Sequence, residues 1–292
     1  MDPKGRHVLV TGAAMGIGRA LASRFAERGA NLVLVDLSAQ EAALSEFAAR
    51  LAARHGTRTL KCLCDLTEDD GPERVYQSVA AAGIEVSILV NNAGVCWYGR
   101  FGDMPPERLE SVILLNCMAY AKMCRLFLPP MIARDEGGVL NVSSVSAFQP
   151  VPMLALYAAT KAFTQSLTEA VRLELPPRSK VVVATLNPPF TRTHLIEDAG
   201  VPSDYVPVKM SLMDADKVAS LGVDAFLGGR PRYVPGVFNK VLYLSLVRIT
   251  PRRVMDLLLR VLTKRLSEIF PKNAAALLSG GEGAKGQGTR AK

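Results

Sequence analysis

A tyrosine, a lysine and a serine stand at spacings that suit proton transfer. Tyr157 precedes Lys161 by four residues, so both side chains share one face if the segment is helical. Free tyrosine titrates near pH ~10, and a nearby positive charge favours the phenolate and lowers that value. Ser144 ends an apolar run 13 residues before Tyr157, where its hydroxyl can hydrogen-bond an oxygen that gains charge. Together the three residues predict a general acid/base site.

The start of the chain carries a dinucleotide-binding pattern that complements this chemistry. The segment VLVTGAAMGIGRALA places Gly12, Gly16 and Gly18 between an expected strand and an expected helix. Glycines there let the backbone approach a pyrophosphate, which the helix N-terminus stabilises. Asp36 follows Gly18 by 18 residues, where an acidic residue can accept hydrogen bonds from the adenosine ribose. A nicotinamide cofactor would supply the hydride exchange that an acid/base group completes with a proton.

Asp36 also bears on which nicotinamide cofactor binds. A carboxylate at this place repels the 2′-phosphate of NADP at close range. Met15 and Leu37 occupy neighbouring positions where a compensating basic residue could stand, so the sequence favours NAD. Arg19 keeps NADP open as the less favoured choice. A purely structural role, in which Asp36 caps a helix that starts near Ser38, also stays open.

Alternating apolar runs and helical stretches would position these residues. The runs HVLVTG, NLVLVD, TLKCLCD, SILVNNAG, GVLNVSS and KVVVATLNP lack strict alternation, as expected for strands buried on both faces. The pattern predicts a doubly wound parallel sheet in a three-layer α/β/α domain. We expect a catalytic domain over residues 1–235 with a substrate lid near 190–213. A basic helical extension over 236–272 and a disordered tail over 273–292 would follow.

These motifs together resemble the short-chain dehydrogenase/reductase family, in its compact single-domain form, over about residues 5–230. The resemblance rests on TGxxxGIG at 11–18, Asp36, Asp65, NNAG at 91–94 and YxxxK at 157–161. It implies a Rossmann-fold, NAD(P)-dependent oxidoreductase that interconverts a secondary alcohol and a ketone. It also implies a homo-oligomer, either a dimer or a tetramer.

Roles for individual residues follow from the resemblance. It implies that Tyr157 is the general acid/base, that Lys161 also holds the nicotinamide ribose, and that Ser144 polarises the substrate carbonyl. Asn116 matches a helix-kinking asparagine that binds the water of a proton relay. The positions that match cofactor-binding residues are Gly12, Met15, Gly16, Ile17, Gly18, Asp36, Asp65, Leu66, Asn91, Ala93, Gly94, Tyr157, Lys161, Pro188 and Thr193.

One position departs from the family pattern. In NPPFTRT, Pro189 stands where the family usually has glycine. Proline removes an N–H and fixes φ, so the backbone beside the nicotinamide should follow a different course. We expect a changed substrate pocket or loop mobility rather than a loss of activity. His194 in the following loop could touch substrate or simply face solvent.

The expected substrate is a small, lipophilic alcohol or ketone. Aromatic residues in CWYGRF at 96–101 would add to the pocket wall, although scattered aromatics can also be plain packing. The C-terminal extension resembles that of family members acting on steroids or long-chain acyl compounds.

Charge and cysteine usage bear on compartment and partners. Residues 230–292 hold 13 Lys/Arg against 3 Asp/Glu, so the net charge of +8 is a property of the C-terminal fifth. The 5 cysteines lack the spacing that a metal site needs, and we expect reduced thiols and no metal. The chain opens without a signal-peptide pattern, which predicts a cytoplasmic protein.

The C-terminal extension has the clearest helical period in the chain. Its expected apolar face is Val254, Leu258, Val261, Leu262, Leu266 and Ile269, with basic residues opposite. Such a helix could lie on an anionic membrane, or its apolar stripe could pack on its own domain or on a second subunit. Phe270 is its single stacking aromatic, which speaks against nucleic-acid binding.

Two other function classes compete with a dehydrogenase. A serine hydrolase is excluded, because the chain has no G-x-S-x-G elbow. A non-catalytic dinucleotide sensor or membrane-peripheral binding protein on the same fold stays open. The presence of both Tyr157 and Lys161 argues against it, since such proteins have usually lost one of the two.

Overall fold

A computed structural model of the chain describes residues 1–192, 212–241, 243, 250, 251, 253–255, 257 and 259. The chain divides into two compact units, residues 1–249 and 250–292, and the fold and the candidate site belong to the first. Thr193, His194 and most of the expected lid lie outside the described residues. The same holds for most of the expected helical extension and for the whole expected tail.

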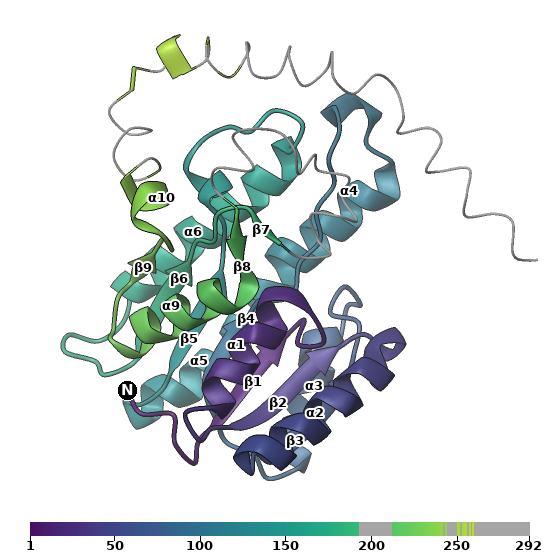
Figure 1. Ribbon diagram of the computed structural model, residues 1–292, viewed down its shortest axis with the longest axis vertical. Helices are drawn as coiled ribbons and strands as arrows, with labels where there is room; N and C mark the ends of the chain where they lie inside the picture. Colours follow the sequence, from purple (N-terminus) through teal and green to yellow (C-terminus); the bar gives the residue numbers. More distant parts are fainter. Residues whose placement is uncertain are drawn as a thin grey trace, which may run out of the picture. The chain divides into compact units, whose positions relative to one another are not determined.

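A seven-stranded parallel sheet forms the centre of the first unit (Figure 1). Its strands are β1 (His7–Thr11), β2 (Asn31–Asp36), β3 (Thr59–Leu63), β4 (Val86–Asn91), β5 (Gly138–Val142), β6 (Val182–Leu186) and β9 (Arg232–Tyr233). Their order is β3-β2-β1-β4-β5-β6-β9. Strands β2 and β3 thus lie on one side of β1, and β4 and the strands after it lie on the other, so the order of strand addition reverses at β1. The predicted doubly wound parallel sheet is confirmed. Ligands of such sheets bind beyond the carboxyl ends of the strands, near the reversal.

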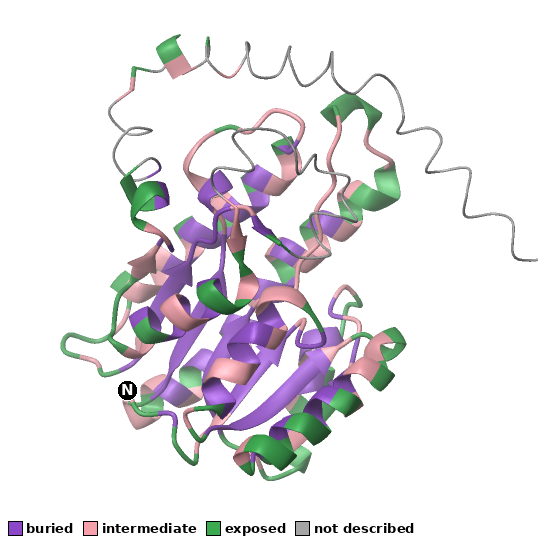
Figure 2. Ribbon diagram, viewed as in Figure 1, coloured by how far each residue is buried: buried purple, intermediate pink, exposed green. Residues whose placement is uncertain are grey.

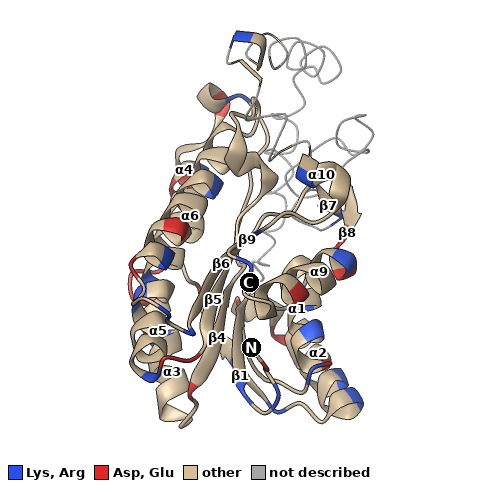
Figure 3. Ribbon diagram, turned by 90° about the vertical axis from the view of Figure 1, so that its left-hand side faces the viewer, with Lys and Arg blue, Asp and Glu red and all other residues tan. Residues whose placement is uncertain are grey.

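Helices cover both faces of this sheet (Figure 3). One layer holds α1 (Gly16–Ala26), α2 (Glu41–His55) and α9 (Ala215–Leu227). The other holds α3 (Gly71–Ala81), α4 (Pro106–Ile113), α5 (Tyr120–Arg134) and α6 (Ala155–Leu173). Charged residues, coloured blue and red, lie mainly on the helices and in the loops, while the strands are largely uncharged. The predicted three-layer α/β/α arrangement is therefore present.

The strands lack a polar face because each of their sides meets a helix layer. Val8 and Val10 belong to the apolar core on the side of α1, whereas Leu9 belongs to the core on the side of α5. Side chains alternate along a strand, so a strand buried on both faces needs apolar residues at every position. Figure 2 shows the central strands β2, β1, β4, β5 and β6 as buried, whereas the edge strands β3 and β9 are mostly not. The apolar runs in the sequence reflect this double burial.

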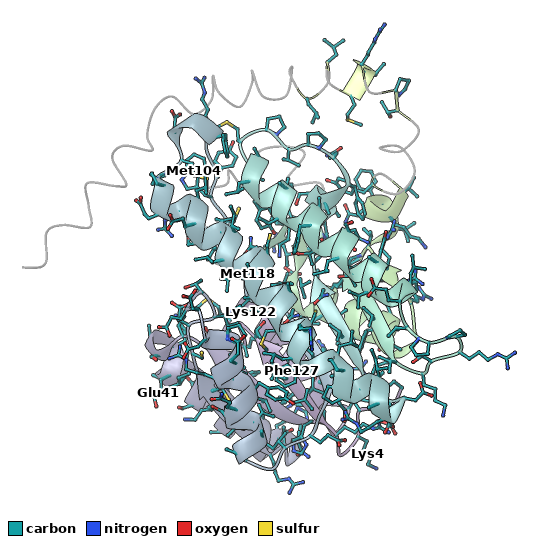
Figure 4. All side chains as sticks on the ribbon, turned by 180° about the vertical axis from the view of Figure 1, so that it is seen from behind. Lys4, Glu41, Met104, Met118, Lys122 and Phe127 are labelled. Atoms are coloured by element: carbon teal, nitrogen blue, oxygen red, sulfur yellow. The ribbon has the colours of Figure 1, made fainter. Side chains whose placement is uncertain are left out.

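A long helical stretch, residues 106–134, joins α4 and α5 through a π-helical segment, Leu114–Ala119. By length and composition it could cross a membrane. Its apolar character has another cause, however, because Met123, Phe127 and Met131 are buried against the sheet. Figure 4 shows Met118, Lys122 and Phe127 along this stretch.

Smaller elements follow β6. A two-stranded parallel sheet pairs β7 (Thr191–Arg192) with β8 (Met213–Asp214). The short helix α10 (Val237–Val241) comes after β9. Val234 and Tyr243 are buried together with Val145, so this part of the chain packs beside the loop that carries Ser144.

Candidate active site

The turn between β1 and α1 has the geometry of a nucleotide-binding turn. Gly12 and Gly16 have φ of 64° and 56°, in the left-handed region that favours glycine. A Cβ on Gly18 would overlap the carbonyl oxygen of Gly12 and the side chain of Asn92. The turn therefore leaves its own backbone exposed at the N-terminus of α1, and the residues present fit a dinucleotide.

Asp36 lies against this turn at the end of β2. Its carboxylate accepts hydrogen bonds from the backbone N–H of Ala14 at 2.8 Å and of Leu37 at 2.9 Å. Arg19 instead donates to the carbonyl of Ala14, and its guanidinium lies 4.7 Å from the ring centroid of Phe47. A carboxylate thus stands at the expected ribose position, with the nearest arginine engaged elsewhere.

Asn92, which the sequence reasoning missed, fixes the glycine turn to the neighbouring strand. Its Nδ2 donates to the carbonyl oxygens of Thr11 at 2.9 Å and Gly12 at 3.2 Å. The Thr11 hydroxyl in turn accepts from the backbone N–H groups of Asn92 and Ala93. The signal was available, because an asparagine directly after a central strand, opposite a glycine turn, can satisfy backbone carbonyls there.

The side chain of Asn91, at the end of β4, belongs to a buried hydrogen-bond network. Its Nδ2 donates to Asn141 Oδ1 at 2.9 Å and to Cys124 Sγ at 3.4 Å. The Nδ2 of Asn141 continues to Thr168 at 2.8 Å. This buried network joins β4, β5, α5 and α6, so the side chain of Asn91 holds the sheet to its helices and does not point to the turn.

Asp65 and Leu66 follow β3 at the same edge of the sheet. The Asp65 carboxylate accepts from the backbone and the hydroxyl of Thr67, at 2.8 and 2.7 Å. Leu66 is buried in the core on the side of α5. The side chain of Leu66 thus packs in the core. If this pair contacts an adenine, as the resemblance implies, the contact would come from Asp65 or from the backbone of the two residues.

Tyr157 and Lys161 lie one turn apart on α6, beside the end of β5. The Lys161 Nζ lies 5.6 Å from the ring centroid of Tyr157 and 5.3 Å from that of Tyr120. It donates to the carbonyl oxygen of Val142 at 3.0 Å. Gly94 lies close by, since a Cβ there would come within 3.6 Å of Nζ. The structure therefore brings the predicted pair together next to the loop that follows the central strand β4.

Burial dominates the electrostatics of both residues. It raises the pKa of the Tyr157 phenol; the nearby Cys96 adds to the rise, and a hydrogen bond with Ser144 opposes it. Burial lowers the pKa of Lys161 to about 8. The expectation that Tyr157 is unusually acidic is wrong for this structure, because burial raises the pKa of its phenol by more than the hydrogen bond with Ser144 lowers it.

Ser144 is the second residue after the end of β5. Its hydroxyl accepts from the backbone N–H of Ser146 at 3.2 Å and shares a hydrogen bond with Tyr157. Because a hydroxyl both donates and accepts, Ser144 can also donate to a substrate oxygen. The two residues therefore meet as the sequence predicted.

Asn116 lies in the π-helical segment between α4 and α5, a distortion that often marks functional sites. Its side chain is fully buried and bonds the backbone of Val95 twice, at 3.0 and 2.9 Å. The same amide donates to the Thr160 hydroxyl, which donates to the carbonyl of Tyr157. Asn116 thus ties the loop after β4 to the helix that carries Tyr157.

Two prolines form the backbone after β6. The carbonyl of Pro188 accepts from the backbone N–H of Val145 at 3.0 Å, and that of Pro189 accepts from the Thr191 hydroxyl at 2.9 Å. Both prolines are buried. Pro188 therefore supports the Ser144 loop, and Pro189 shapes the entry to β7.

An apolar cluster lies next to the acid/base residues. Leu154 is buried, and Cys96, Tyr98, Val151 and Phe190 pack against it. Burial raises the pKa of the Cys96 thiol to about 12, and Lys161 partly opposes this. The backbone N–H of Gly99 donates to Met153, which joins the loop after β4 to the loop before α6. Part of the predicted aromatic segment thus packs in a cluster whose Cys96 lies near Tyr157.

Comparisons with known proteins agree on one family. A family model described as short chain dehydrogenase matches residues 6–201. Very-long-chain 3-oxoacyl-CoA reductase from Bos taurus is 32% identical over 195 residues, which cover 65% of this chain and 61% of that protein. The protein of the same name from Anas platyrhynchos is 32% identical over 214 residues, with 69% and 67% covered. The chain thus spans about 61% of the length of the bovine relative.

Solved structures with the same fold carry nicotinamide cofactors. A short-chain dehydrogenase from Sphingobium yanoikuyae in complex with NADPH is 31% identical, with a TM-score of 0.75 over 82% of this chain and 91% of that chain. A short chain dehydrogenase/reductase from Burkholderia phymatum in complex with NAD is 25% identical, with a TM-score of 0.74 over 89% and 96%. Both cofactors therefore occur among proteins similar to this one.

Proposed function

Since this chain belongs to the short-chain dehydrogenase/reductase family of oxidoreductases, we propose that it interconverts a ketone and a secondary alcohol on a lipophilic acyl substrate. The observation that carries this proposal is the meeting of Tyr157, Ser144 and Lys161 beside the apolar cluster around Leu154. A 3-oxoacyl thioester is the leading candidate, and a steroid ketone is the second.

The acid/base chemistry belongs to Tyr157. A bound nicotinamide supplies or accepts the hydride, and the chain handles the proton. Tyr157 gives its proton to the substrate oxygen while Ser144 donates a hydrogen bond to the same oxygen. The raised pKa keeps the phenol protonated at neutral pH, which is the form that can give a proton to a ketone oxygen. The Lys161 ammonium lies close enough to Tyr157 to help return a proton to the phenolate after the reaction. Asn116 holds the turn of α6 that carries Tyr157, through its hydrogen bond with Thr160.

The glycine turn and Asp36 are the residues that would hold the cofactor. Backbone N–H groups at the start of α1 would bind a pyrophosphate, and the Asp36 carboxylate would accept hydrogen bonds from the adenosine ribose. NAD is the preferred form, because this carboxylate opposes a 2′-phosphate and Met15 and Leu37 provide no compensating charge. Among the remaining predicted positions, Thr193 belongs to the proposal on family resemblance alone.

The lipophilic substrate is supported by two independent lines. The cluster of Leu154, Cys96, Tyr98, Val151 and Phe190 offers an apolar surface next to Tyr157, and pockets lined in this way bind apolar ligands. The bovine and duck relatives are named very-long-chain 3-oxoacyl-CoA reductases. An acyl chain along this wall would bring a 3-oxo group to the phenol.

A homo-oligomer fits the exposed apolar side chains on one helix layer. Ile113, Met118, Phe163 and Leu173 lie on the outward side of residues 106–134 and of α6. Met118 is seen on that side in Figure 4. Contact between two copies through these helices would bury them. Sedimentation of the purified protein measures the number of subunits.

The protein acts in the cytoplasm, at a membrane surface where its lipophilic substrate is found. Val237, Phe238 and Val241 are exposed on α10, next to Lys240, and the chain beyond residue 230 is strongly basic. Apolar side chains beside positive charge suit an anionic bilayer.

Cofactor absorbance tests the reaction directly. Purified protein is mixed with NADH or NADPH and a panel of 3-oxoacyl-CoA ketones, steroid ketones and keto sugars. We expect the fastest cofactor oxidation with NADH and a long-chain 3-oxoacyl-CoA. Tyr157→Phe should bind cofactor normally while turnover falls by orders of magnitude. Equal turnover in the two proteins would contradict the assigned acid, and a preference for keto sugars would contradict the lipophilic substrate.

A further inference from the structure

A chain of polar side chains holds the backbone of Ser144 from behind. The Asn187 Nδ2 donates to the carbonyl oxygen of Ser144 at 3.2 Å and to Gln165 Oε1 at 2.8 Å. The Gln165 Nε2 donates to Glu169 Oε1 at 2.6 Å. Glu169 forms an ion pair with Arg232. A continuous path of hydrogen bonds thus runs from the Ser144 loop to the surface of the molecule.

The same residues hold the far end of the loop. Ser144 begins a single 3-10 turn, Val145–Phe148, and the Arg232 guanidinium lies 5.9 Å from the ring centroid of Phe148. The backbone N–H of Asn187 donates to the carbonyl of Tyr233 at 2.8 Å, which fixes Asn187 to β9. Both ends of the turn are therefore held by residues at the edge of the sheet that β6 and β9 form.

Burial makes this arrangement rigid. Asn187 is fully buried and Gln165 is nearly so, and hydrogen bonds in such surroundings are strong and costly to break. Asn187 contacts the Ser144 backbone, and it is fixed by partners on two elements, α6 and β9. Neither Asn187 nor Gln165 needs to touch substrate to affect where the Ser144 hydroxyl lies.

We propose that Asn187 is a positioning residue for Ser144, and that Gln165 and Glu169 orient Asn187 for this role. The buried amide fixes the Ser144 carbonyl, so that the Ser144 hydroxyl stays directed at Tyr157 and at the substrate oxygen. The proposal rests on the proposed reaction, since it concerns the step in which Ser144 and Tyr157 meet the ketone. Displacing a reacting group by about 1 Å can cost on the order of a hundredfold in rate.

A double-mutant cycle tests whether Asn187 acts through Ser144. Asn187→Ala, Ser144→Ala and the double variant are assayed with the best 3-oxoacyl-CoA ketone of the substrate panel. We expect Asn187→Ala to lower kcat by about tenfold to a hundredfold with little change in the cofactor KM. In the Ser144→Ala background the same substitution should cost less than about twofold. An equal loss in both backgrounds, or no loss in either, would overturn the positioning role.

The pH profile gives a second readout that a merely structural role would not move. The Ser144 hydrogen bond lowers the pKa of Tyr157. Loosening Ser144 should therefore move the Tyr157-dependent limb of kcat/KM to higher pH in Asn187→Ala. A profile that keeps its wild-type midpoint while kcat falls would count against the proposal.

Two further variants keep the outcome interpretable. Asn31→Ala is the matched control, because Asn31 is a buried asparagine whose Nδ2 donates to the Gly5 carbonyl at the other end of the sheet; its kcat should stay near wild type. Gln165→Met breaks the next link and replaces Asn187→Ala if that variant does not fold.

Tyr157→Phe separates the two proposals. Wild-type turnover in it overturns the reaction itself, whereas loss of turnover there with an additive Asn187 effect overturns only the positioning role.

Discussion

Lys161 is a buried cation in a site that must also accommodate a cofactor. Burial lowers its pKa from 10.5 to about 8, and the carbonyl of Val142 is the hydrogen-bond acceptor for its ammonium. Because most lysines remain in water, keeping this one inside costs folding free energy whenever it is charged. The protein therefore holds the ammonium next to Tyr157 at the expense of stability.

Replacing Lys161 should stabilise the fold at neutral pH while it removes activity. The folded-state pKa lies below the unfolded one, so the unfolded chain binds more protons between about 8 and 10.5, and wild-type stability rises with pH across that window. We expect Lys161→Met to raise the free energy of unfolding by about 1 to 3 kcal/mol below pH ~8. This advantage should vanish as the pH approaches 10.5.

Urea unfolding at several pH values measures this difference. Lys122→Met is the control, because Lys122 is a partly exposed lysine on α5, visible in Figure 4. Its difference from wild type should not depend on pH in the same way. If Lys161→Met were destabilised equally at pH 7 and pH 10, the buried charge would not be the source of the cost.

Asp36 decides cofactor choice by charge while it also holds the glycine turn. Its carboxylate accepts the Ala14 N–H, so truncating it would disturb the turn as well. Asp36→Asn keeps an acceptor oxygen for this bond and removes the charge. We expect the ratio of kcat/KM for NADH over NADPH to fall by at least about tenfold, since the repulsion of a 2′-phosphate is lost. Steady-state kinetics with both cofactors would show an unchanged ratio if charge were not the cause.

The helix α1 depends on a close approach that only glycine permits. A Cβ on Gly18 would overlap the Gly12 carbonyl and the Asn92 side chain, which itself bonds that carbonyl. Gly18→Ala should therefore lower cofactor affinity by at least about tenfold and reduce thermal stability. Gly102→Ala is the matched control, because a Cβ at Gly102 meets nothing within 4 Å. Cofactor titration by fluorescence compares the two, and equal affinity would refute the packing argument.

The elements that local patterns define were predictable from the sequence. Apolar runs without a polar face indicated strands buried on both sides, and glycines after the first run indicated the turn that the structure shows. The pairing of Tyr157 with Lys161 also follows from a local rule, since residues four apart share a helix face. Where the chemistry depends on spacing within one element, the sequence was sufficient.

Features that depend on packing between distant elements were not predictable. The pKa of Tyr157 shifts opposite to the expectation because its burial is set by the whole fold. Asn91 and its hydrogen-bond partner Asn141 are distant in sequence, so the network between them could not be foreseen. The same reason hides Asn187, whose partners come from α6 and the Ser144 loop.

The membrane proposal rests on the distribution of charge along the sequence and on the exposed apolar residues of α10. The chain up to residue 229 holds 22 Lys/Arg and 24 Asp/Glu, so the basic excess lies almost wholly beyond it. At the start of that region Val237 is 81% exposed and Phe238 is 54% exposed. A surface of this kind would keep the enzyme close to substrates that dissolve in lipid.

Substitution tests this idea better than truncation. Ending the chain near residue 235 would also remove Asn239 and Tyr243, which are buried, and Tyr243 packs with Val145 beside the Ser144 loop. A truncated protein could therefore lose its site and its membrane contact together. Replacing exposed residues on α10 leaves those buried contacts in place.

The double variant Val237→Ser, Phe238→Ser should lose membrane binding while it keeps its turnover on a soluble, short-chain ketone. We expect several-fold less co-sedimentation with vesicles of phosphatidylcholine and phosphatidylglycerol, since each buried CH₂ contributes about 0.8 kcal/mol. Wild-type binding should weaken as salt is added or phosphatidylglycerol is left out, because Lys240 and the basic residues that follow it act through charge. Leu173→Ser is the control, because Leu173 is 73% exposed on a different helix, α6; since Leu173 also belongs to the proposed subunit contact, sedimentation checks that this variant keeps the wild-type number of subunits. Equal co-sedimentation of the double variant and wild type would show that α10 is not the contact.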